Sequence, residues 1–260
     1  MIPKVIHYCW FGGNPKPDII NKCIESWKKF CPDWEIKEWN ETNFDINEVP
    51  YMKEAYDSKK WAFVSDVARL LVIYKYGGIY MDTDVELLST LYSLTDYEAF
   101  FAFESERNIN TGLGFGAVKH HKIIKAMLDY YNDRHFTIDG KVDLTPCPAG
   151  NTSALTKCCE KFIRDGSTQT IDNVCILSCS DYFKFARHHA TATWTEGNQS
   201  YIRKPYRPTR LKQFLRQTKR FDYIEKHFGK KALKMYTFFA YDFLEFGLFY
   251  LIKRSFRRKH

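Results

Sequence analysis

Two carboxylates, Asp82 and Asp84, stand two residues apart in the run Tyr80-Met81-Asp82-Thr83-Asp84. On an extended backbone, side chains at i and i+2 project to the same side, so both carboxylates face one place. Short carboxylates at a strand end can hold a hard divalent cation that keeps open positions for phosphate oxygens and water. Such an ion neutralises a departing diphosphate, which is the difficult part of breaking a bond between a sugar and a nucleotide.

A second charged pair precedes the acidic one along the chain. Asp66 and Arg69 lie three residues apart on a predicted helix and therefore face the same way. The plain structural explanation is an intrahelical ion pair, which at a surface stabilises by less than about 1 kcal/mol. The surrounding positions are almost wholly apolar, however, which places this pair on an otherwise buried helix. Buried charges need partners, and a polar ligand such as a sugar is one candidate.

Taken in order, these motifs carry a resemblance. Ser65-Asp66-x-x-Arg69 followed by Gly77-Gly78-x-Tyr80-x-Asp82-x-Asp84 resembles the central signature of the family 32 glycosyltransferases with a DxD sugar-binding region. That family includes bacterial capsule and lipopolysaccharide transferases and the fungal initiating mannosyltransferase. The motifs are similar also to those in the catalytic domain of the large bacterial glucosylating toxins. The opening stretch IPKVIHYCWFGG matches such proteins too, and the resemblance covers about residues 1–120 well and is absent beyond 195.

The resemblance implies a GT-A fold, an α/β architecture with a Rossmann-like mixed sheet flanked by helices, and a role for each matching residue. Trp10 is expected to stack on the donor base, although a Trp at a strand end is also a common core residue. The other residues expected to bind the donor are Ser65, Asp66, Arg69, Tyr80 and Asp82. Asp66 and Arg69 are also expected to act in catalysis. Asp82 and Asp84 are expected to bind the metal, Mn²⁺ with Mg²⁺ as the alternative.

Two further segments carry candidate site residues. Asn110 precedes the glycine-rich run 111–116 and by resemblance faces the reaction centre, which makes it the third catalytic candidate. A turn capped by this Asn explains the same pattern equally well. The segment from His188 to Trp194 resembles the family's His-His…Ser-Trp segment, with Thr193 in the place of Ser. It predicts His189 as a metal ligand and Trp194 over the donor sugar, whereas the alternative is a pair of structural histidines at a strand end.

The elements that must position these residues follow from apolar periodicity and turn signals. Strand, helix and strand at 4–10, 17–30 and 34–39 open a βαβ unit, and a long helix at 58–76 leads into a strand at 79–81. Further strands are predicted at 98–103, 112–118 and 172–178, and further helices at 121–133 and 152–164. None of the eight cysteines forms a CxxC pair, and no His and acid partner can be assigned to any of them. The N-terminus is not a signal peptide, so we expect a cytoplasmic protein with reduced thiols.

The basic charge is concentrated at the C-terminal end. Residues 203–260 carry 17 Lys and Arg against four acidic residues, so the net +8 of the chain leaves −5 for residues 1–202. We expect a catalytic domain at 1–205 and a basic, aromatic, helical tail at 206–260. The apolar segment 235–252 is interrupted by Asp242 and Glu245, which opposes a bilayer span and favours an interfacial helix on an anionic membrane. Packing of this helix on the catalytic domain or on a second subunit is the alternative.

The sequence therefore predicts a retaining glycosyltransferase on the inner face of the cell membrane. The donor is a nucleotide-sugar carrying a hexose, with uridine favoured by resemblance, and the acceptor is a surface-polysaccharide or lipid-linked glycan. Two other classes of function compete with this reading. One is a non-catalytic module that binds a nucleotide-sugar, and the intact Asp82, Asp84 and Arg69 oppose it. The other is a nucleic-acid-binding protein acting through the basic tail, which the negative body opposes.

Overall fold

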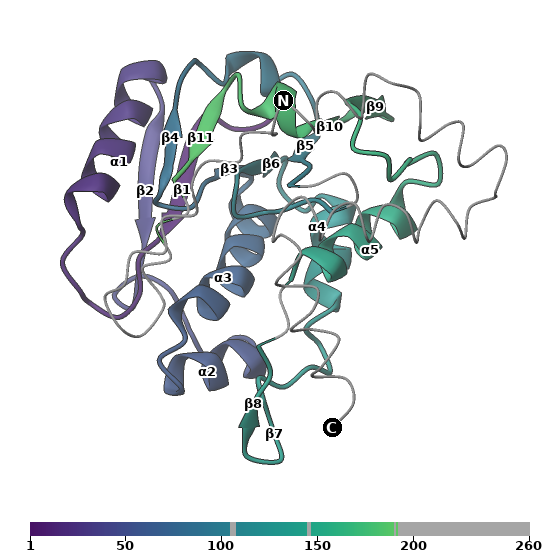
Figure 1. Cartoon of the computed structure of the whole chain (residues 1–260). Helices are drawn as coiled ribbons and strands as arrows, with labels where there is room; N and C mark the ends of the chain where they lie inside the picture. Colours follow the sequence, from purple (N-terminus) through teal and green to yellow (C-terminus); the bar gives the residue numbers. More distant parts are fainter. Residues whose placement is uncertain (105–107, 145–146, 190, 192–260) are drawn as a thin grey trace, which may run out of the picture. The chain divides into compact units, whose positions relative to one another are not determined.

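The computed structural model describes residues 1–104, 108–144, 147–189 and 191 (Figure 1). Its helices and strands alternate through the first half of the chain. In chain order they are β1 (Val5–Cys9), α1 (Asp18–Phe30), β2 (Glu35–Trp39), α2 (Pro50–Asp57), α3 (Trp61–Tyr76), β3 (Gly78–Tyr80), β4 (Val85–Leu87), the 3₁₀ turn η1 (Tyr92–Leu94), β5 (Ala99–Ala102), β6 (Phe115–Ala117), α4 (Lys122–Asp129), β7 (Thr137–Ile138), β8 (Lys141–Val142), α5 (Pro148–Cys158), β9 (Gln169–Ile171), β10 (Val174–Leu177), α6 (Cys179–Tyr182) and β11 (Ala186–His188).

A seven-stranded mixed sheet in the order β2-β1-β3-β6-β5-β10-β9 forms the centre of this unit. Strands β2, β1 and β3 are parallel neighbours, β6 runs antiparallel to both β3 and β5, and β10 runs parallel to β5. Strands β4 and β11 pair in a separate small sheet. Parallel strands need crossover connections, and α1 and α2–α3 supply them between β1, β2 and β3. The expected α/β architecture, a mixed sheet flanked by helices, is confirmed.

Apolar side chains on the two faces of the sheet enter two separate cores. Along β5, Phe101 belongs to the core under α2, α3, α4 and α5, whereas its neighbour Phe100 belongs to the core that contains Trp27 of α1. The same alternation puts Tyr80 on the α3 face and Ile79 on the α1 face. Side chains alternate because successive residues of a strand point to opposite faces. Beyond the end of β3, a side chain on the same face as Tyr80 therefore lies next to α3.

Most predicted elements of the first half are confirmed, and the differences have local causes. The helix expected from residue 152 begins at Pro148, whose fixed φ suits the first helical position, and it ends at Cys158 rather than at 164. The short elements α2, β4, β7, β8, β9, α6 and β11 were not predicted from the sequence. Strands of two or three residues, such as β4, show too little alternation to be recognised without their partners.

His7 is a buried structural residue. Its ring is almost fully buried, with Nε2 placed 3.0 Å from the Gly77 carbonyl oxygen and Nδ1 accepting from Trp39 Nε1 at 3.1 Å. Burial lowers the pKa of His7 from 6.5 to about 4, so the ring is neutral near pH 7. A neutral ring with one donor and one acceptor satisfies both partners and ties β1 to β2 and to the end of α3.

The predicted tail 206–260, its boundary at 205 and Trp194 lie outside the described residues. Within the described ranges, no helix is both long and apolar enough to cross a membrane. All eight cysteines are free thiols.

Candidate active site

Asp82 and Asp84 occupy the turn between β3 and β4. The sequence predicted an extended backbone here, but the Val85 amide donates to the Asp82 carbonyl oxygen at 3.0 Å and bends the chain. The two carboxylates nevertheless converge, and His188 joins them. One ligand atom from each of Asp82, Asp84 and His188 lies within 4.8 Å of the others. Two carboxylate oxygens and an imidazole nitrogen at this spacing are suitable ligands for one divalent ion.

Arg69 connects the helix motif to the acidic turn. Its side chain is only 4% exposed, and Nη2 lies 2.8 Å from Asp66 Oδ1 and 3.4 Å from Asp82 Oδ1. Nε donates to the Ser65 carbonyl oxygen at 3.0 Å, and the guanidinium carbon lies 5.1 Å from the centre of the Tyr80 ring. The predicted pair is therefore a buried bridge rather than a surface ion pair, and it brings together the four motif residues Ser65, Asp66, Tyr80 and Asp82.

The two acidic residues of the turn have different electrostatic surroundings. Burial raises the pKa of Asp82 above its usual range, although Arg69 opposes this change. Burial also acts to raise the pKa of Asp84, but hydrogen bonds from His188 and Thr191 outweigh it and lower that pKa to about 2. Thr191 donates to Asp84 Oδ2 from its backbone N at 2.9 Å and from Oγ1 at 3.1 Å. Asp84 is thus a fixed, ionised carboxylate.

The histidine beside the acidic pair is His188, not the predicted His189. His188 Nε2 lies 3.2 Å from Asp84 Oδ1. The His189 ring turns to Glu86, with Nε2 placed 2.9 Å from Oε2, and only the backbone N of His189 contacts Asp84, at the carbonyl oxygen. The cause is the pairing of β11 with β4, which aligns His188 with Val85 next to the turn. Neighbouring residues of a strand face opposite ways, so only one of the two histidines can reach the acidic pair.

The glycine-rich loop after Asn110 lies directly against the acidic turn. Asn110 Oδ1 accepts from the Gly112 amide at 2.7 Å, which is the turn-capping contact that the sequence offered as one of two explanations. The loop is also in the site, because a Cβ atom on Gly112 would lie 2.4 Å from Asp82 Oδ2 and 3.0 Å from Arg69 Nη1. The Gly112 carbonyl oxygen accepts from the Asp82 amide at 3.2 Å. Asn110 therefore holds the loop in shape, and the missing side chain of Gly112 leaves room for the side chains of Asp82 and Arg69.

The first turn of α5 forms a wall of the site that sequence reasoning missed. The buried Cys147 thiol lies near the Asp66 carboxylate, and burial raises the pKa of this thiol well above its usual range. Asn151, which is 1% exposed, donates from Nδ2 to Thr111 Oγ1 at 3.1 Å. A protonated, buried thiol is a poor nucleophile, so Cys147 lines the site beside Asp66 as a neutral group. The only local signal for this wall is Pro148 at the start of the helix.

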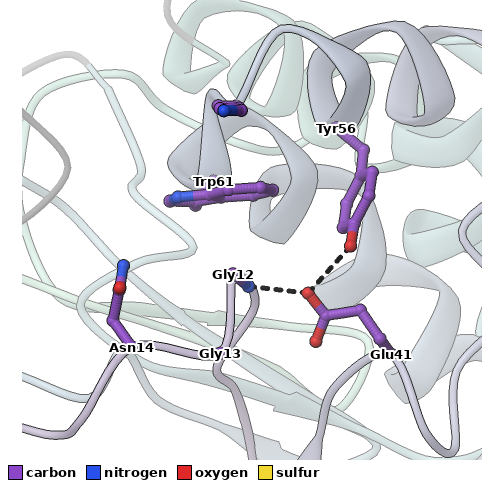
Figure 2. A pocket seen from close by; sticks show the side chains of 7 residues that line it. Gly12, Gly13, Asn14, Glu41, Tyr56 and Trp61 are labelled. Atoms are coloured by element: carbon purple, nitrogen blue, oxygen red, sulfur yellow. Dashed lines mark hydrogen bonds between the residues drawn. The ribbon is translucent and has the colours of Figure 1, made fainter.

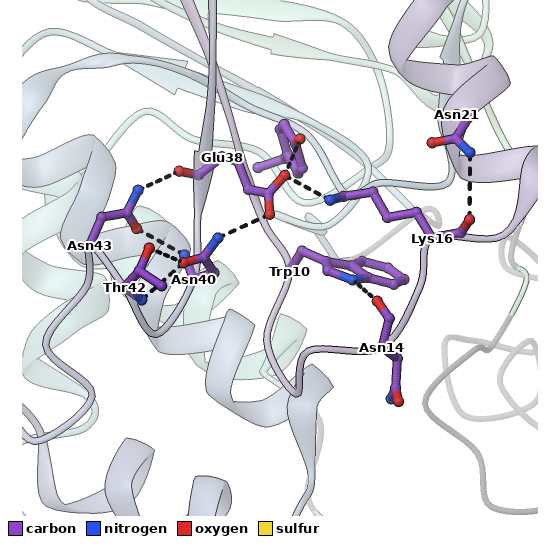
Figure 3. A network of polar contacts seen from close by, with 9 residues as sticks. Trp10, Asn14, Lys16, Asn21, Glu38, Asn40, Thr42 and Asn43 are labelled. Carbon is purple, nitrogen blue, oxygen red and sulfur yellow. Dashed lines mark hydrogen bonds and ion pairs between the residues drawn. The ribbon is translucent and has the colours of Figure 1, made fainter.

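Trp10 lies at the end of β1, as expected, within a polar network (Figure 3). Its Nε1 donates to the Asn14 carbonyl oxygen at 2.7 Å, and the Lys16 ammonium lies 5.7 Å from the centre of its ring. Lys16 is in turn paired with Glu38 Oε2 at 2.7 Å, and the same oxygen accepts from Tyr8 Oη at 2.6 Å. The indole is partly buried and held from one side by this loop. Its role in base stacking stays a prediction.

Comparisons with known proteins find sequence similarity over the region that contains this site. Residues 17–101 match the model of the glycosyltransferase sugar-binding region containing a DXD motif. Inositol phosphoceramide mannosyltransferase 3 of Schizosaccharomyces pombe is 32% identical over 134 residues, which are 47% of this chain and 35% of that protein. Human alpha-1,4-N-acetylglucosaminyltransferase is 35% identical over 79 residues, 28% of this chain and 22% of that protein. The solved PaToxG glycosyltransferase has a TM-score of 0.48 at 22% identity, covering 60% of this chain and 69% of its own.

The chain spans less than half the length of the curated relatives reported above. The matched region nevertheless contains α3, with Asp66 and Arg69, and the acidic turn at the end of β3. Those are the parts that the structure joins through the Arg69 bridge. Over residues 17–101, the chain is therefore similar to the glycosyltransferase sugar-binding region that contains a DXD motif.

Proposed function

We propose that this chain transfers a hexose from a nucleotide-sugar donor to a glycan acceptor, with a divalent metal held by Asp82, Asp84 and His188. The observation that carries the proposal is the convergence of these three side chains within 4.8 Å of one another. They meet beside an arginine that is buried against Asp82. Such a site presents two positive charges to a diphosphate, one from the metal ion and one from the Arg69 guanidinium.

The donor set fits a divalent ion. Carboxylate oxygens suit Mn²⁺ and Mg²⁺, and an added imidazole nitrogen favours Mn²⁺ over Mg²⁺. The Asp84 carboxylate is already ionised at pH 7, so it can bind a cation without first releasing a proton. Bound there, the ion supplies charge neutralisation for the leaving diphosphate.

The residues of this chain then have separate tasks. Arg69, fixed by Asp66 and Ser65, contributes a second positive charge to the phosphate oxygen that receives the electron pair of the broken C1–O bond. The acceptor hydroxyl forms the new bond to C1 and passes its proton to that phosphate oxygen. Asn110 and Gly112 keep the loop close to the reacting groups. This front-face displacement retains the anomeric configuration and uses no protein nucleophile.

Two measurements test the reaction. Asp84→Ala should abolish Mn²⁺-dependent hydrolysis of the donor, while Asp96→Ala, an exposed acidic residue on the loop before β5, should leave it unchanged. An Asp84→Ala enzyme that keeps its activity would refute the metal site. NMR of the product reads the anomeric configuration directly, and inversion would rule out front-face displacement.

Two features of the proposal concern the whole protein rather than the site. The acceptor is a surface-polysaccharide or lipid-linked glycan, and the apolar segment 235–252 holds the chain on the inner face of the cell membrane. Support comes from the sequence, which flanks this segment with Lys and Arg. Flotation with vesicles containing anionic lipid, compared with neutral vesicles, tests this placement. A chain that floats with neither, and that binds RNA instead, would favour the nucleic-acid alternative.

A further inference from the structure

A pocket lies at the same edge of the sheet as the acidic turn. It has a volume of about 590 Å³ and is lined by Gly12, Gly13, Asn14, Glu41, Tyr56, Lys59 and Trp61 (Figure 2). We call it the Glu41 pocket. None of the residues assigned above to metal, sugar or diphosphate lines it.

The aromatic part of the Glu41 pocket is firmly placed. Trp61, the first residue of α3, packs so closely on Gly12 that a Cβ atom there would lie 2.7 Å from Trp61 Cε2. Tyr56 meets the same indole edge-on, with the ring centroids 5.1 Å apart at an interplanar angle of 66°. Two fixed aromatic rings in an open pocket suit a flat ligand with an apolar face.

The carboxylate of the pocket is fixed as well. Glu41 Oε1 accepts from the Gly12 amide at 2.6 Å and from Tyr56 Oη at 3.1 Å (Figure 2). Both bonds end on Oε1, and the part of the chain that the structure describes offers Oε2 no donor. An ionised carboxylate only accepts hydrogen bonds. The pocket therefore presents a flat ligand with an acceptor that has lone pairs to spare.

The topology relates the Glu41 pocket to the acidic turn. Glu41 follows β2, Gly12 follows β1 and Asp82 follows β3, and these three strands are parallel neighbours in the order β2-β1-β3. Their carboxyl ends lie at one edge, where α/β sheets bind ligands, and adjacent strands are about 4.8 Å apart. Helix α3 also links the two places, because Trp61 and Arg69 are separated by about 12 Å along its axis. That separation matches the reach of a nucleoside diphosphate from its base to its outer phosphate.

We propose that the Glu41 pocket, which Trp10 does not line, binds the base of the donor in place of the stacking on Trp10 that the resemblance implied, and that Glu41 selects guanine. This inference rests on the function proposed above, because it takes the diphosphate to lie at Asp82 and Asp84. Guanine presents two adjacent donors, N1–H and the N2 amino group, which Oε2 can accept together. Uracil presents one N–H between two carbonyl oxygens, so a carboxylate facing it meets like-charged lone pairs. Adenine and cytosine offer one amino group beside an acceptor nitrogen.

The uridine preference came only from the resemblance, and the chemistry of this pocket points to a different base. Hydrogen bonds to an ionised carboxylate are about twice as strong as neutral ones. A base whose edge makes two such bonds should bind about tenfold to a hundredfold more tightly than a base whose edge cannot make them. Removing the charge of Glu41 should erase most of that factor for guanine and little of the affinity for uracil.

Titration calorimetry of the full chain with GDP, UDP, CDP and ADP in the presence of Mn²⁺ tests the proposal. The wild-type chain should bind GDP at least tenfold more tightly than UDP. Glu41→Gln should weaken GDP at least tenfold and change UDP less than twofold. The matched control is Glu35→Gln, an exposed residue of β2, which should leave both affinities unchanged.

The outcomes separate this inference from the proposed function. A wild-type chain that binds UDP more tightly than GDP overturns the guanine assignment even if Glu41→Gln does not fold. Equal weakening of all four nucleotides by Glu41→Gln also overturns it, because Glu41 would then be only a structural residue. Unchanged affinities of Glu41→Gln for all four nucleotides also overturn it, because the pocket would then not contact the base. A wild-type chain that binds none of the nucleotides contradicts the proposed function itself.

Discussion

Replacing Gly112 by Ala tests whether the loop after Asn110 sets the geometry of the acidic turn. The new methyl group would lie 2.4 Å from Asp82 Oδ2, whereas ordinary van der Waals contact begins at 3.4 Å. The carboxylate must therefore retreat by about 1 Å, and a misplacement of that size in a catalytic site costs about 10²-fold in rate. We therefore expect kcat/KM for donor turnover to fall by about 10²-fold. The assay measures release of the nucleoside diphosphate.

The same substitution should leave the fold nearly intact. Gly112 does not have a positive φ, so an added Cβ brings no backbone strain. The Asp82 side chain is 29% exposed and can move toward solvent. The control is Gly140→Ala in the β7–β8 turn, where φ is +74° and nothing lies within 4 Å of the new methyl group. It should lower stability by about 1 kcal/mol and leave activity unchanged. A Gly112→Ala enzyme with more than half of the wild-type activity would refute the reasoning.

Two further predictions concern histidines. His188→Ala should weaken Mn²⁺ binding in calorimetry at least tenfold and His189→Ala less than twofold, since only His188 contacts Asp84 through its ring; the opposite order would restore the ligand predicted from the sequence. His7, with a folded pKa near 4 against 6.5 unfolded, favours the fold while neutral, so the free energy of unfolding should fall by about 3 kcal/mol between pH 6.5 and 4. Urea unfolding across that range should show a smaller fall for His7→Gln, and identical pH profiles would exclude His7 as the cause.

Residue spacing alone predicts the parts of the site that lie close together along the chain. Asp66 and Arg69 share a helix face because they are three residues apart, and the structure confirms their pairing at 2.8 Å. The apolar run of β1 and the long helix before Gly77 were also readable, because helix and strand periods repeat over several residues.

The distant residues that complete the site are selected by long-range packing. His188 rather than His189 reaches Asp84 because of the register of β11 on β4, two strands of three residues each. Slipping that register by one residue exchanges the two histidines, and no local pattern fixes it. Cys147 beside Asp66, Gly112 against Asp82 and Glu41 beside Gly12 are likewise contacts between separate segments. Such contacts depend on how strands and helices pack, which local periodicity does not encode.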